Sequence, residues 1–526
     1  MGPEHPAAHA VGHPHKLAVV MGRSGESLTY AELDAASNRV AHLLRANGLA
    51  VGDHVAVLLT NGLPWFEIVW GCLRAGIYVT PINWHLVAHE AGYIVADSGA
   101  TALFADAALA PTVTALGRSL DGVRHRFAVG GDLAGFRSYA ESTAEQPATP
   151  MDDEREGTWM FYSSGTTGRP KGIKPALPAL GVGDPQPFGM LLRFLYGFTP
   201  TTMYLSPAPL YHAGPAGWTT QTHRLGGTVV VMEDFDPEHF LRLIEVHGIT
   251  HTHVVPTHLI RMLKLPPHLR AAHELSTLTH MVHAAAPCPV EAKHAALEWL
   301  GPIVHEFYSG SEGVGFCTIS PEEWLVRPGS VGKSLHGVLH ILGDDGQEVA
   351  PGTEGEVWFE SPHRFEYHGD PHKTAGAWND RGWSTLGDIG YVDDAGYLYL
   401  TDRRANMIIS GGVNIYPRQI EDALAMHPAV VDVAVIGTPH ADLGEQVTAF
   451  VQRADDVLPE MELADTLLAH CRERLSGFTC PREIRFVASL PRMPNGKLLK
   501  RHLTPGFATV VLPGGAEMPA KAPDVH

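Results

Sequence analysis

The chain has 526 residues, of which 44% are hydrophobic and 18% charged, as in soluble globular proteins of about three or four domain-sized units. Its formal net charge of −19 argues against nucleic acid or an anionic membrane as main partner, because both require a basic face. The five cysteines are scattered, and neither a signal segment nor a run of about eighteen apolar residues occurs. We therefore expect a cytoplasmic protein with free thiols and no integral membrane segment.

Residues 1–15 are rich in proline, histidine and alanine, and we expect them to be frayed. A helix is predicted from Thr29 onward, because apolar side chains recur on one side of it. These are Leu33, Val40, Leu43 and Leu44. Short buried strands and helices then alternate. The expected strands are 54–59, 77–82, 102–105, 203–206, 228–232, 252–255, 278–282, 303–304, 397–400, 430–436, 446–452 and 483–487, and the expected helices are 65–75, 238–247, 460–475 and those that begin at 257 and 417.

This alternation predicts an α/β fold with a large N-terminal domain of layered mixed sheets and covering helices. A small, mobile α+β domain of about a hundred residues is expected after it. Within the large domain, the proline- and glycine-rich stretch 175–187 reads as a mobile insertion. The 32 histidines lack the carboxylate or thiol partners of a metal site, so pairs such as His280 and His283 are interpreted as core or surface residues.

A loop dense in hydroxyls and glycines follows the apolar run 159–161 and is closed by a lysine. Its glycines let backbone N–H groups converge on an anion, its hydroxyls add donors, and Lys171 adds a positive charge. It is not a Walker loop, and a plain solvated loop would not explain the Pro-Lys-Gly that ends it. The loop therefore predicts a polyphosphate-binding site. The residues expected to bind are Ser163, Ser164, Gly165, Thr166, Thr167, Gly168 and Lys171.

This loop, and further motifs in the same order and spacing, resemble those of the adenylate-forming (ANL) superfamily, which includes acyl-CoA ligases, luciferases and adenylation domains of peptide synthetases. The resemblance extends from about Leu28 to Leu503. It implies that the loop holds the β- and γ-phosphates of ATP, with Thr166 near the metal.

A second motif, Glu-Phe-Tyr-Ser-Gly-Ser-Glu-Gly, begins at Glu306 after an apolar strand. An aromatic residue at a strand end can stack on a base, and Glu312 can direct a carboxylate toward Mg²⁺ on the phosphates, since one carboxylate plus ATP oxygens suffices for this ion. The residues expected around the nucleotide are Tyr308, Ser309, Gly310 and Ser311.

Two further segments are expected to border the acyl group. The resemblance places the small residues Ala284, Ala285 and Ala286 beside the adenine and the acyl pocket, although a buried Ala-Pro turn is an equal alternative. His212 stands where peptide synthetases carry an Asp for the substrate's amino group, so an α-amino acid is not expected. In acyl-CoA ligases the matching histidine lies beside the acid's carboxylate; the alternative is a satisfied core residue.

The remaining roles are implied by the resemblance alone. Asp388 would accept hydrogen bonds from both ribose hydroxyls, which suits an ionised acceptor, and Arg403 would donate to the ribose or phosphate. Lys497, on an Asn-Gly turn, would be the catalytic lysine rather than an ordinary surface residue. The hinge would fall at Arg404 and Ala405, and the CoA tunnel would be lined by Ser410, Gly411 and Gly412.

The sequence thus predicts an acyl-CoA ligase, AMP-forming, that activates a bulky apolar acid with ATP, Mg²⁺ and CoA, with a homodimer left open. The expected domains are 1–402 (acyl and ATP sites), a hinge at 403–406, a mobile domain at 407–505 and a tail at 506–526. Departures from the family pattern at Ser309, Leu386, Ala405 and Asn406 leave open a ligase that only transfers a preformed acyl-adenylate. Two further functions also stay open, namely acyl transfer to a carrier protein and non-catalytic sensing of an adenylate or acyl group.

Overall fold

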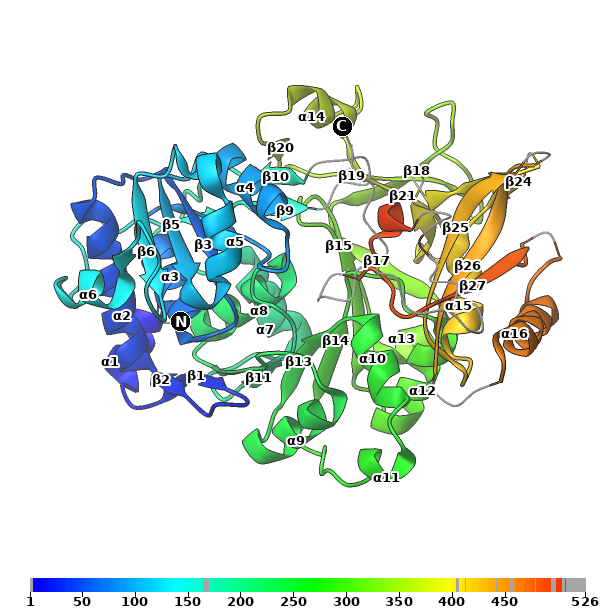
Figure 1. Cartoon of the computed structure of the whole chain (residues 1–526), viewed down its shortest axis with the longest axis horizontal. Helices are drawn as coiled ribbons and strands as arrows, with labels where there is room; N and C mark the ends of the chain where they lie inside the picture. The colour runs from blue at the N-terminus through cyan, green and yellow to red at the C-terminus, as the bar shows by residue number, and fades with distance from the viewer. Residues whose placement is uncertain are drawn as a thin grey trace.

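The computed structural model describes residues 3–163, 170–403, 406–411, 413–440, 443–454, 458–477, 479–492, 498–503 and 507, with the backbone alone for Arg403, Asn414 and Arg501. Figure 1 shows an N-terminal α/β layer, a central sheet with its helices, and a smaller C-terminal unit packed beside that sheet. The predicted fold class is confirmed. None of the helices in these ranges is long and apolar enough to cross a membrane.

The first sheet is parallel throughout. Its strands are β3 (His54–Leu58), β4 (Tyr78–Pro81), β5 (Ala102–Asp106), β6 (His125–Val129), β7 (Arg137–Ser138) and β8 (Thr158–Trp159). Their order is β7-β6-β5-β3-β4-β8. One face packs on α4 (Ala88–Asp97) and α5 (Ala110–Ala115), whereas the other faces α2 (Tyr30–Ala46) and α3 (Leu63–Arg74). A further short helix, α6 (Tyr139–Ala144), follows β7.

The second sheet runs through the middle of the molecule. Its strands are β1 (Leu17–Met21), β2 (Ser27–Thr29), β11 (Met203–Ser206), β12 (Thr228–Val231), β13 (His251–Val254), β14 (His280–His283), β15 (Val304–Ser309), β16 (Phe316–Ile319), β17 (Ser330–His336), β18 (Val338–Leu342), β19 (Gly355–Glu360), β21 (Ser384–Val392) and β22 (Leu398–Arg403). Their order is β18-β19-β21-β22-β17-β16-β15-β14-β13-β11-β12-β1-β2. Strands β1 and β11 to β15 pair in parallel, whereas β15 to β22 pair antiparallel. The sheet is therefore mixed, as expected.

Successive side chains of the parallel strands point to opposite faces of the sheet and so belong to two halves of the core. Val229 and Val231 face α8 (Ala213–Arg224) and α7 (Pro187–Tyr196), whereas Val230 between them faces α9 (Pro237–His247), α10 (Pro256–Leu263) and α12 (Val290–Leu300). Such alternation follows from the two-residue repeat of a strand. The helices α2, α3, α7 and α8 consequently form a layer that is shared by both sheets (Figure 1).

A small antiparallel sheet frames the predicted phosphate loop. It consists of β9 (Phe161–Ser163), β10 (Lys171–Lys174) and β20 (Glu366–Tyr367), in the order β20-β10-β9. Lys171 stands opposite Ser163 across the β9–β10 pair, so the two ends of the loop are held side by side. Other short helices are α1 (Pro6–Gly12), α11 (Pro267–Arg270), α13 (Pro321–Val326) and α14 (Pro371–Gly376).

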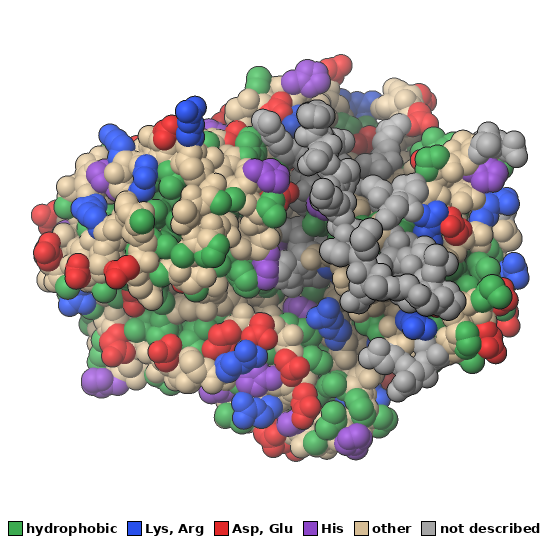
Figure 2. Space-filling view, in the orientation of Figure 1, with side chains coloured by type: hydrophobic (Ala, Val, Ile, Leu, Met, Phe, Trp, Pro, Cys, Tyr) green, Lys and Arg blue, Asp and Glu red, His purple; other side chains and the backbone are tan. Residues whose placement is uncertain are grey.

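The C-terminal unit has its own apolar core. It contains β23 (Ile408–Ser410), β24 (Val413–Ile415), β25 (Val430–His440), β26 (Gly444–Arg453), β27 (Glu483–Val487), α15 (Pro417–Ala425), α16 (Glu460–Arg474) and the 3₁₀ turn Lys500–His502. As predicted, Pro417 opens a helix, and it occupies the first turn, where a missing N–H costs nothing. On the face shown in Figure 2, acidic and basic side chains are interspersed over the molecule.

Most of the expected elements occur, with shifted ends, but three predictions were incomplete or wrong. The described part of segment 1–15 is not frayed, because α1 packs beside α2 and the side chains of Glu4 and His5 are buried. Helix α7 was missed. The expected strand at 303–304 continues to Ser309, so the first four of the eight residues of the second motif lie on the strand. Residues 175–186 form no helix or strand, but the Tyr78 hydroxyl donates to the Pro175 carbonyl at 2.8 Å.

Candidate active site

A cavity of about 1020 Å³ lies between the central sheet and the C-terminal unit. Residues from the predicted phosphate loop, the second motif, the two acyl-bordering segments and β21 line it, although they lie more than two hundred positions apart in the sequence. Those singled out from the sequence are Ser163, Lys171, His212, Ala285, Ala286, Tyr308, Ser309, Gly310, Ser311, Glu312 and Asp388. The fold therefore brings the described members of the predicted nucleotide site to one place. Ala284 is buried beneath this wall and does not line it.

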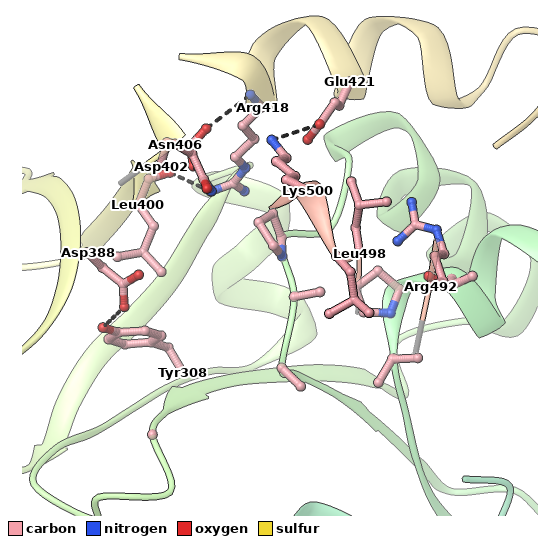
Figure 3. Close-up of a pocket in the computed structure, with 18 of the residues that line it drawn as sticks. Tyr308, Asp388, Leu400, Asp402, Asn406, Arg418, Glu421, Arg492, Leu498 and Lys500 are labelled. Carbon is pink, nitrogen blue, oxygen red and sulfur yellow. Dashed lines mark hydrogen bonds and ion pairs between the residues drawn. The ribbon is translucent and has the colours of Figure 1, made fainter. Parts of the chain in front are cut away.

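Tyr308 and Asp388 form a pair on neighbouring parts of the cavity wall (Figure 3). The Tyr308 hydroxyl donates to Asp388 Oδ2 at 2.6 Å, and the Asp388 side chain comes from β21, where it stands opposite Arg403 of β22. Asp388 is only 7% exposed. A buried carboxylate needs hydrogen-bond donors, and it retains further lone pairs for a diol.

Glu312 is held by a tyrosine that the sequence reasoning missed. The Tyr367 hydroxyl donates to Glu312 Oε1 at 3.0 Å, and Lys171 Nζ lies 4.5 Å from the centroid of the Tyr367 ring. Tyr367 thus connects the carboxylate expected to face Mg²⁺ with the lysine expected to face phosphate. A hard oxygen donor beside a cavity fits Mg²⁺, which takes most of its ligands from water and phosphate. No sequence signal marks Tyr367, because it comes from β20 of the small sheet.

The Ala-rich segment carries local backbone strain. Ala285 has φ of +72°, the only positive φ found at a non-glycine position among the described residues. Such a conformation costs about 1–3 kcal/mol and persists where the surrounding structure imposes it, often at binding sites. Ala285 and Ala286 line the cavity, and the role of the segment beside the adenine and the acyl group stays a prediction.

Two departures from the family motif have visible consequences. The Ser309 hydroxyl donates to the Gly315 carbonyl at 2.7 Å and ties the strand end to the start of β16. Asn406 Nδ2 donates to Asp402 Oδ1 at 3.0 Å beside the predicted hinge. Leu386, a further departure, also lines the cavity. Its methyl groups lie so close to Gly310 that a β-carbon added at Gly310 would be 2.8 Å from them.

The wall around His212 is aromatic or small. His212 precedes the first turn of α8, and its ring lies 4.3 Å from that of Tyr211, centroid to centroid. The neighbouring lining residues are Phe161, Ala208, Ala213, Gly214, Pro215, His253, Val255 and Phe307. This part of the cavity wall, which we call the acyl chamber, consists mainly of aromatic, small and apolar side chains.

The C-terminal unit presents one of its surfaces to the cavity (Figure 3). Lys500 pairs with Glu421 of α15 at 2.8 Å, and Arg492 pairs with Asp432 of β25 at 2.7 Å. Residues 492 and 498–500, which flank position 497, line the cavity, whereas the cavity-lining part of the described chain does not include Ser410 or Gly411. This pose therefore turns Arg492 and residues 498–500, and not Ser410 or Gly411, toward the cavity.

One lysine of the central part contacts the C-terminal unit directly. Lys264, just after α10, donates through Nζ to the carbonyls of Ala425 and Val430. These carbonyls belong to the end of α15 and the start of β25. The contact ties the unit to the central sheet in the observed pose.

Sequence reasoning also missed a buried charge cluster around Glu306, which lines the cavity. Lys293 of α12 is fully buried and donates to Glu306 Oε2 at 2.6 Å, and His283 Nε2 lies 3.4 Å from the same oxygen. Burial, reinforced by Lys293, holds the pKa of His283 well below its usual range. The imidazole is thus neutral, and the Lys293–Glu306 pair keeps β15 against α12.

Several predicted residues lie outside the described part of the chain. These are Ser164, Gly165, Thr166, Thr167, Gly168, Arg404, Ala405, Gly412, Lys497 and the side chain of Arg403. Their roles stay predictions. Among the described residues there is no group of three or more His, Cys, Asp or Glu side chains that could hold a metal ion.

The layered mixed sheets, the smaller C-terminal unit and the cavity between them define the fold of adenylate-forming enzymes. Residues 7–366 match the family of AMP-binding enzymes, and residues 419–497 match the AMP-binding enzyme C-terminal domain. The chain belongs to this family, and it is an AMP-forming ligase of the ANL superfamily.

Individual relatives cover nearly the whole chain. The fatty acid–[acyl-carrier-protein] ligase ScoC of Streptomyces coeruleorubidus is 33% identical over 95% of both chains. A feruloyl-CoA synthase of an Amycolatopsis species is 34% identical over 94% of this chain and 96% of its own. The ATP-bound structure of MatB from Rhodopseudomonas palustris has a TM-score of 0.80 and 27% identity, over 95% of this chain and 98% of its own.

Proposed function

We propose that this protein is an acyl-CoA ligase that joins a bulky apolar carboxylic acid to CoA through an acyl-adenylate. The observation that carries the proposal is the cavity itself. It combines a ribose-type acceptor at Asp388, a metal-type carboxylate at Glu312, both ends of the phosphate loop and an acyl chamber beside His212.

In the first half-reaction the acid's carboxylate attacks the α-phosphorus of ATP, and pyrophosphate leaves. Both reactants are anionic, so the site must screen their charges before they approach. Lys171 supplies one positive charge from β10, and Lys497 is expected to supply a second. Glu312 is the residue that would hold Mg²⁺, which, when bound, neutralises phosphate charge. The Tyr308–Asp388 pair orients the ribose, and this positioning lowers the entropic cost of attack.

In the second half-reaction the CoA thiol attacks the acyl carbon and AMP leaves. The acyl-adenylate is a reactive mixed anhydride that must be kept from water. We propose that the C-terminal unit, taken as 407–505 after a hinge at 403–406, then rotates to withdraw Lys497 and present Ser410 and Gly411 as part of a narrow tunnel.

ATP–pyrophosphate exchange and thioester formation together test this function. We expect exchange that depends on a fatty, aromatic, steroid or terpenoid acid, and a CoA thioester when CoA is added. Lys497→Ala should abolish exchange but spare thioester formation from supplied acyl-adenylate. Lys373→Ala, which alters a half-exposed lysine that pairs with Asp370 outside the cavity, is the matched control. Equal loss of both half-reactions in Lys497→Ala would contradict the two-pose scheme.

A second candidate is transfer of the acyl group to a carrier protein. It is favoured by the similarity to ScoC, an acyl-carrier-protein ligase. Competition between CoA and a pantetheinylated carrier protein for the same acyl-adenylate separates the two, because the true acceptor will show the higher kcat/KM.

The adenylation-deficient alternative makes a different prediction. An enzyme limited in its first half-reaction would form thioester from supplied adenylate yet show no acid-dependent exchange. Acid-dependent exchange at a rate comparable to thioester formation would exclude it.

A further inference from the structure

The acyl chamber contains a buried polar side chain, that of His253, which the reaction scheme does not use. His253 is the third residue of β13 and lines the cavity between α8 and β15. Only 4% of the surface of His253 is exposed. Most of its neighbours in the chamber wall are aromatic, small or apolar, so a buried imidazole is conspicuous there.

Packing fixes the plane of this imidazole. The His253 ring is stacked on Trp218 of α8, with centroids 5.0 Å apart and planes 4° from parallel, and it lies 5.7 Å from the ring of Phe307. Gly214 adjoins the ring edge, where an added β-carbon would come within 2.9 Å of His253 Cε1. Contacts from two elements, α8 and β15, therefore determine where its nitrogens can point.

The Nε2 atom of His253 has no hydrogen-bond partner among the described residues. Leaving a buried polar atom unpaired costs about 1–3 kcal/mol, so such atoms in native proteins usually await a water or a ligand. His253 lines the cavity, so a bound acyl group can contact its ring.

The charge of this imidazole limits what it can recognise. Burial, with a smaller effect from His283, lowers the pKa of His253 to about 3. A neutral imidazole offers no counter-charge to a second carboxylate, so a dicarboxylic acid gains nothing there. It offers one nitrogen that accepts or donates, depending on the tautomer. A hydroxyl group suits both tautomers, because it donates and accepts.

We propose that His253 is a specificity-determining residue that hydrogen-bonds a hydroxyl group carried by the acyl body, remote from the carboxylate. The preferred substrates are then hydroxylated acids with an otherwise apolar, ring-containing body that packs against the aromatic wall. This inference rests on the proposed function, since it concerns the acid bound in the same cavity.

Matched pairs of acids test the proposal. Three pairs differ only by the hydroxyl: 4-hydroxycinnamic and cinnamic acid, lithocholic and 5β-cholanic acid, and 12-hydroxydodecanoic and dodecanoic acid. We expect kcat/KM for ATP–pyrophosphate exchange to favour the hydroxylated member by about tenfold or more in at least one ring-containing pair, the value of one net hydrogen bond. A preference seen only in the dodecanoic pair would contradict the proposal that the preferred acids contain rings.

Two variants separate recognition from packing. His253→Phe keeps a ring stacked on Trp218 but removes the ring nitrogens. The ratio of kcat/KM values within each pair should therefore fall to about one, because kcat/KM decreases for the hydroxylated acid alone. His253→Gln retains a hydrogen-bonding group and should recover part of the preference. An unchanged preference in His253→Phe would overturn the proposal, as would a wild-type preference for the deoxy acids.

Calorimetric binding of the same acids gives a readout that does not require turnover. If the wild type binds the hydroxylated acid more tightly and His253→Phe does not, the role of His253 holds even where no exchange is observed, and only the ligase function fails. If the two acids bind equally to both proteins, the role of His253 is refuted whatever the exchange assay shows.

Discussion

Single side chains in the cavity depend on partners from distant parts of the chain. The Asp388 carboxylate accepts a hydrogen bond from the Tyr308 hydroxyl, and the Glu312 carboxylate accepts one from the Tyr367 hydroxyl. Each pair joins one residue named from a motif to a partner that determines how its carboxylate is oriented. Because both carboxylates are expected to act on ATP, the partner tyrosines should affect nucleotide binding more than binding of the acid.

Tyr308→Phe should raise the KM for ATP by about tenfold, because a hydrogen bond to a charged group is lost while the ring remains. The KM for the acid should change little. Tyr391→Phe is the matched control, since Tyr391 lies on β21 like Asp388 but stacks on Tyr399 away from the cavity. An equal rise in both KM values would show that Tyr308 supports the whole cavity rather than the nucleotide wall.

At the scale of elements, the close approach of α2 and α3 depends on Gly71. A β-carbon at this position would come within 2.4 Å of the β-carbon of Val40 and 2.9 Å of the Ser37 carbonyl oxygen. Gly71→Ala must push the helices apart and should lower the free energy of unfolding by about 1–3 kcal/mol, as overpacking does. Urea denaturation followed by tryptophan fluorescence measures the loss.

Gly12→Ala is the control for this experiment. Gly12 ends α1, and nothing lies within 4 Å of an added β-carbon there. The substitution should be neutral or slightly stabilising, because alanine restricts the unfolded chain. Similar losses in both variants would mean that glycine at position 71 matters for its backbone and not for the close packing of α2 on α3.

The contact of Lys264 with α15 and β25 leads to a prediction about the two half-reactions. Lys264→Met removes both donated hydrogen bonds and should destabilise the pose in which residues 498–500 line the cavity. We expect exchange to slow severalfold, with thioester formation from supplied adenylate unchanged or faster. Arg242→Met, at an exposed position of α9, is the control. Equal slowing of both steps would refute a role in choosing the pose.

At the scale of the whole molecule, buried histidines predict an acid-sensitive fold. Burial lowers the pKa of His251, His223 and His305 to about 4 and that of His258 to about 3. Their ordinary value is 6.5, so the unfolded chain binds protons first as the pH falls. The stability they contribute is complete above pH 6.5 and is lost below it, by about 1.4 kcal/mol per histidine and pH unit.

We therefore expect the Tm to fall steeply between pH 6.5 and pH 5. His258→Phe should make this dependence shallower, because the ring of Phe235, stacked 4.0 Å from His258, can pack on another aromatic ring. His268→Gln, at an exposed histidine, should leave the slope as it is. A Tm that stays constant from pH 7.5 to pH 5 would contradict the neutral buried state of these side chains.

Sequence alone determined the fold class, the family and part of the helices and strands. Buried strands such as 203–206 were found because their apolar periodicity is local, and the phosphate loop was predicted because glycines, hydroxyls and a lysine are adjacent in the chain. The resemblance then named Glu312 and Asp388, which the structure places on one cavity.

Tertiary structure decided what depends on distant neighbours. The contact of Tyr367 with Glu312, the contact of Lys264 with the C-terminal unit and the stacking of His253 on Trp218 each join segments that no local pattern relates. The ordered start of the chain was mispredicted for the same reason, since its polar residues are buried by partners far along the sequence. Periodicity and motif chemistry are properties of neighbouring residues, whereas burial and pairing arise only when the chain is folded.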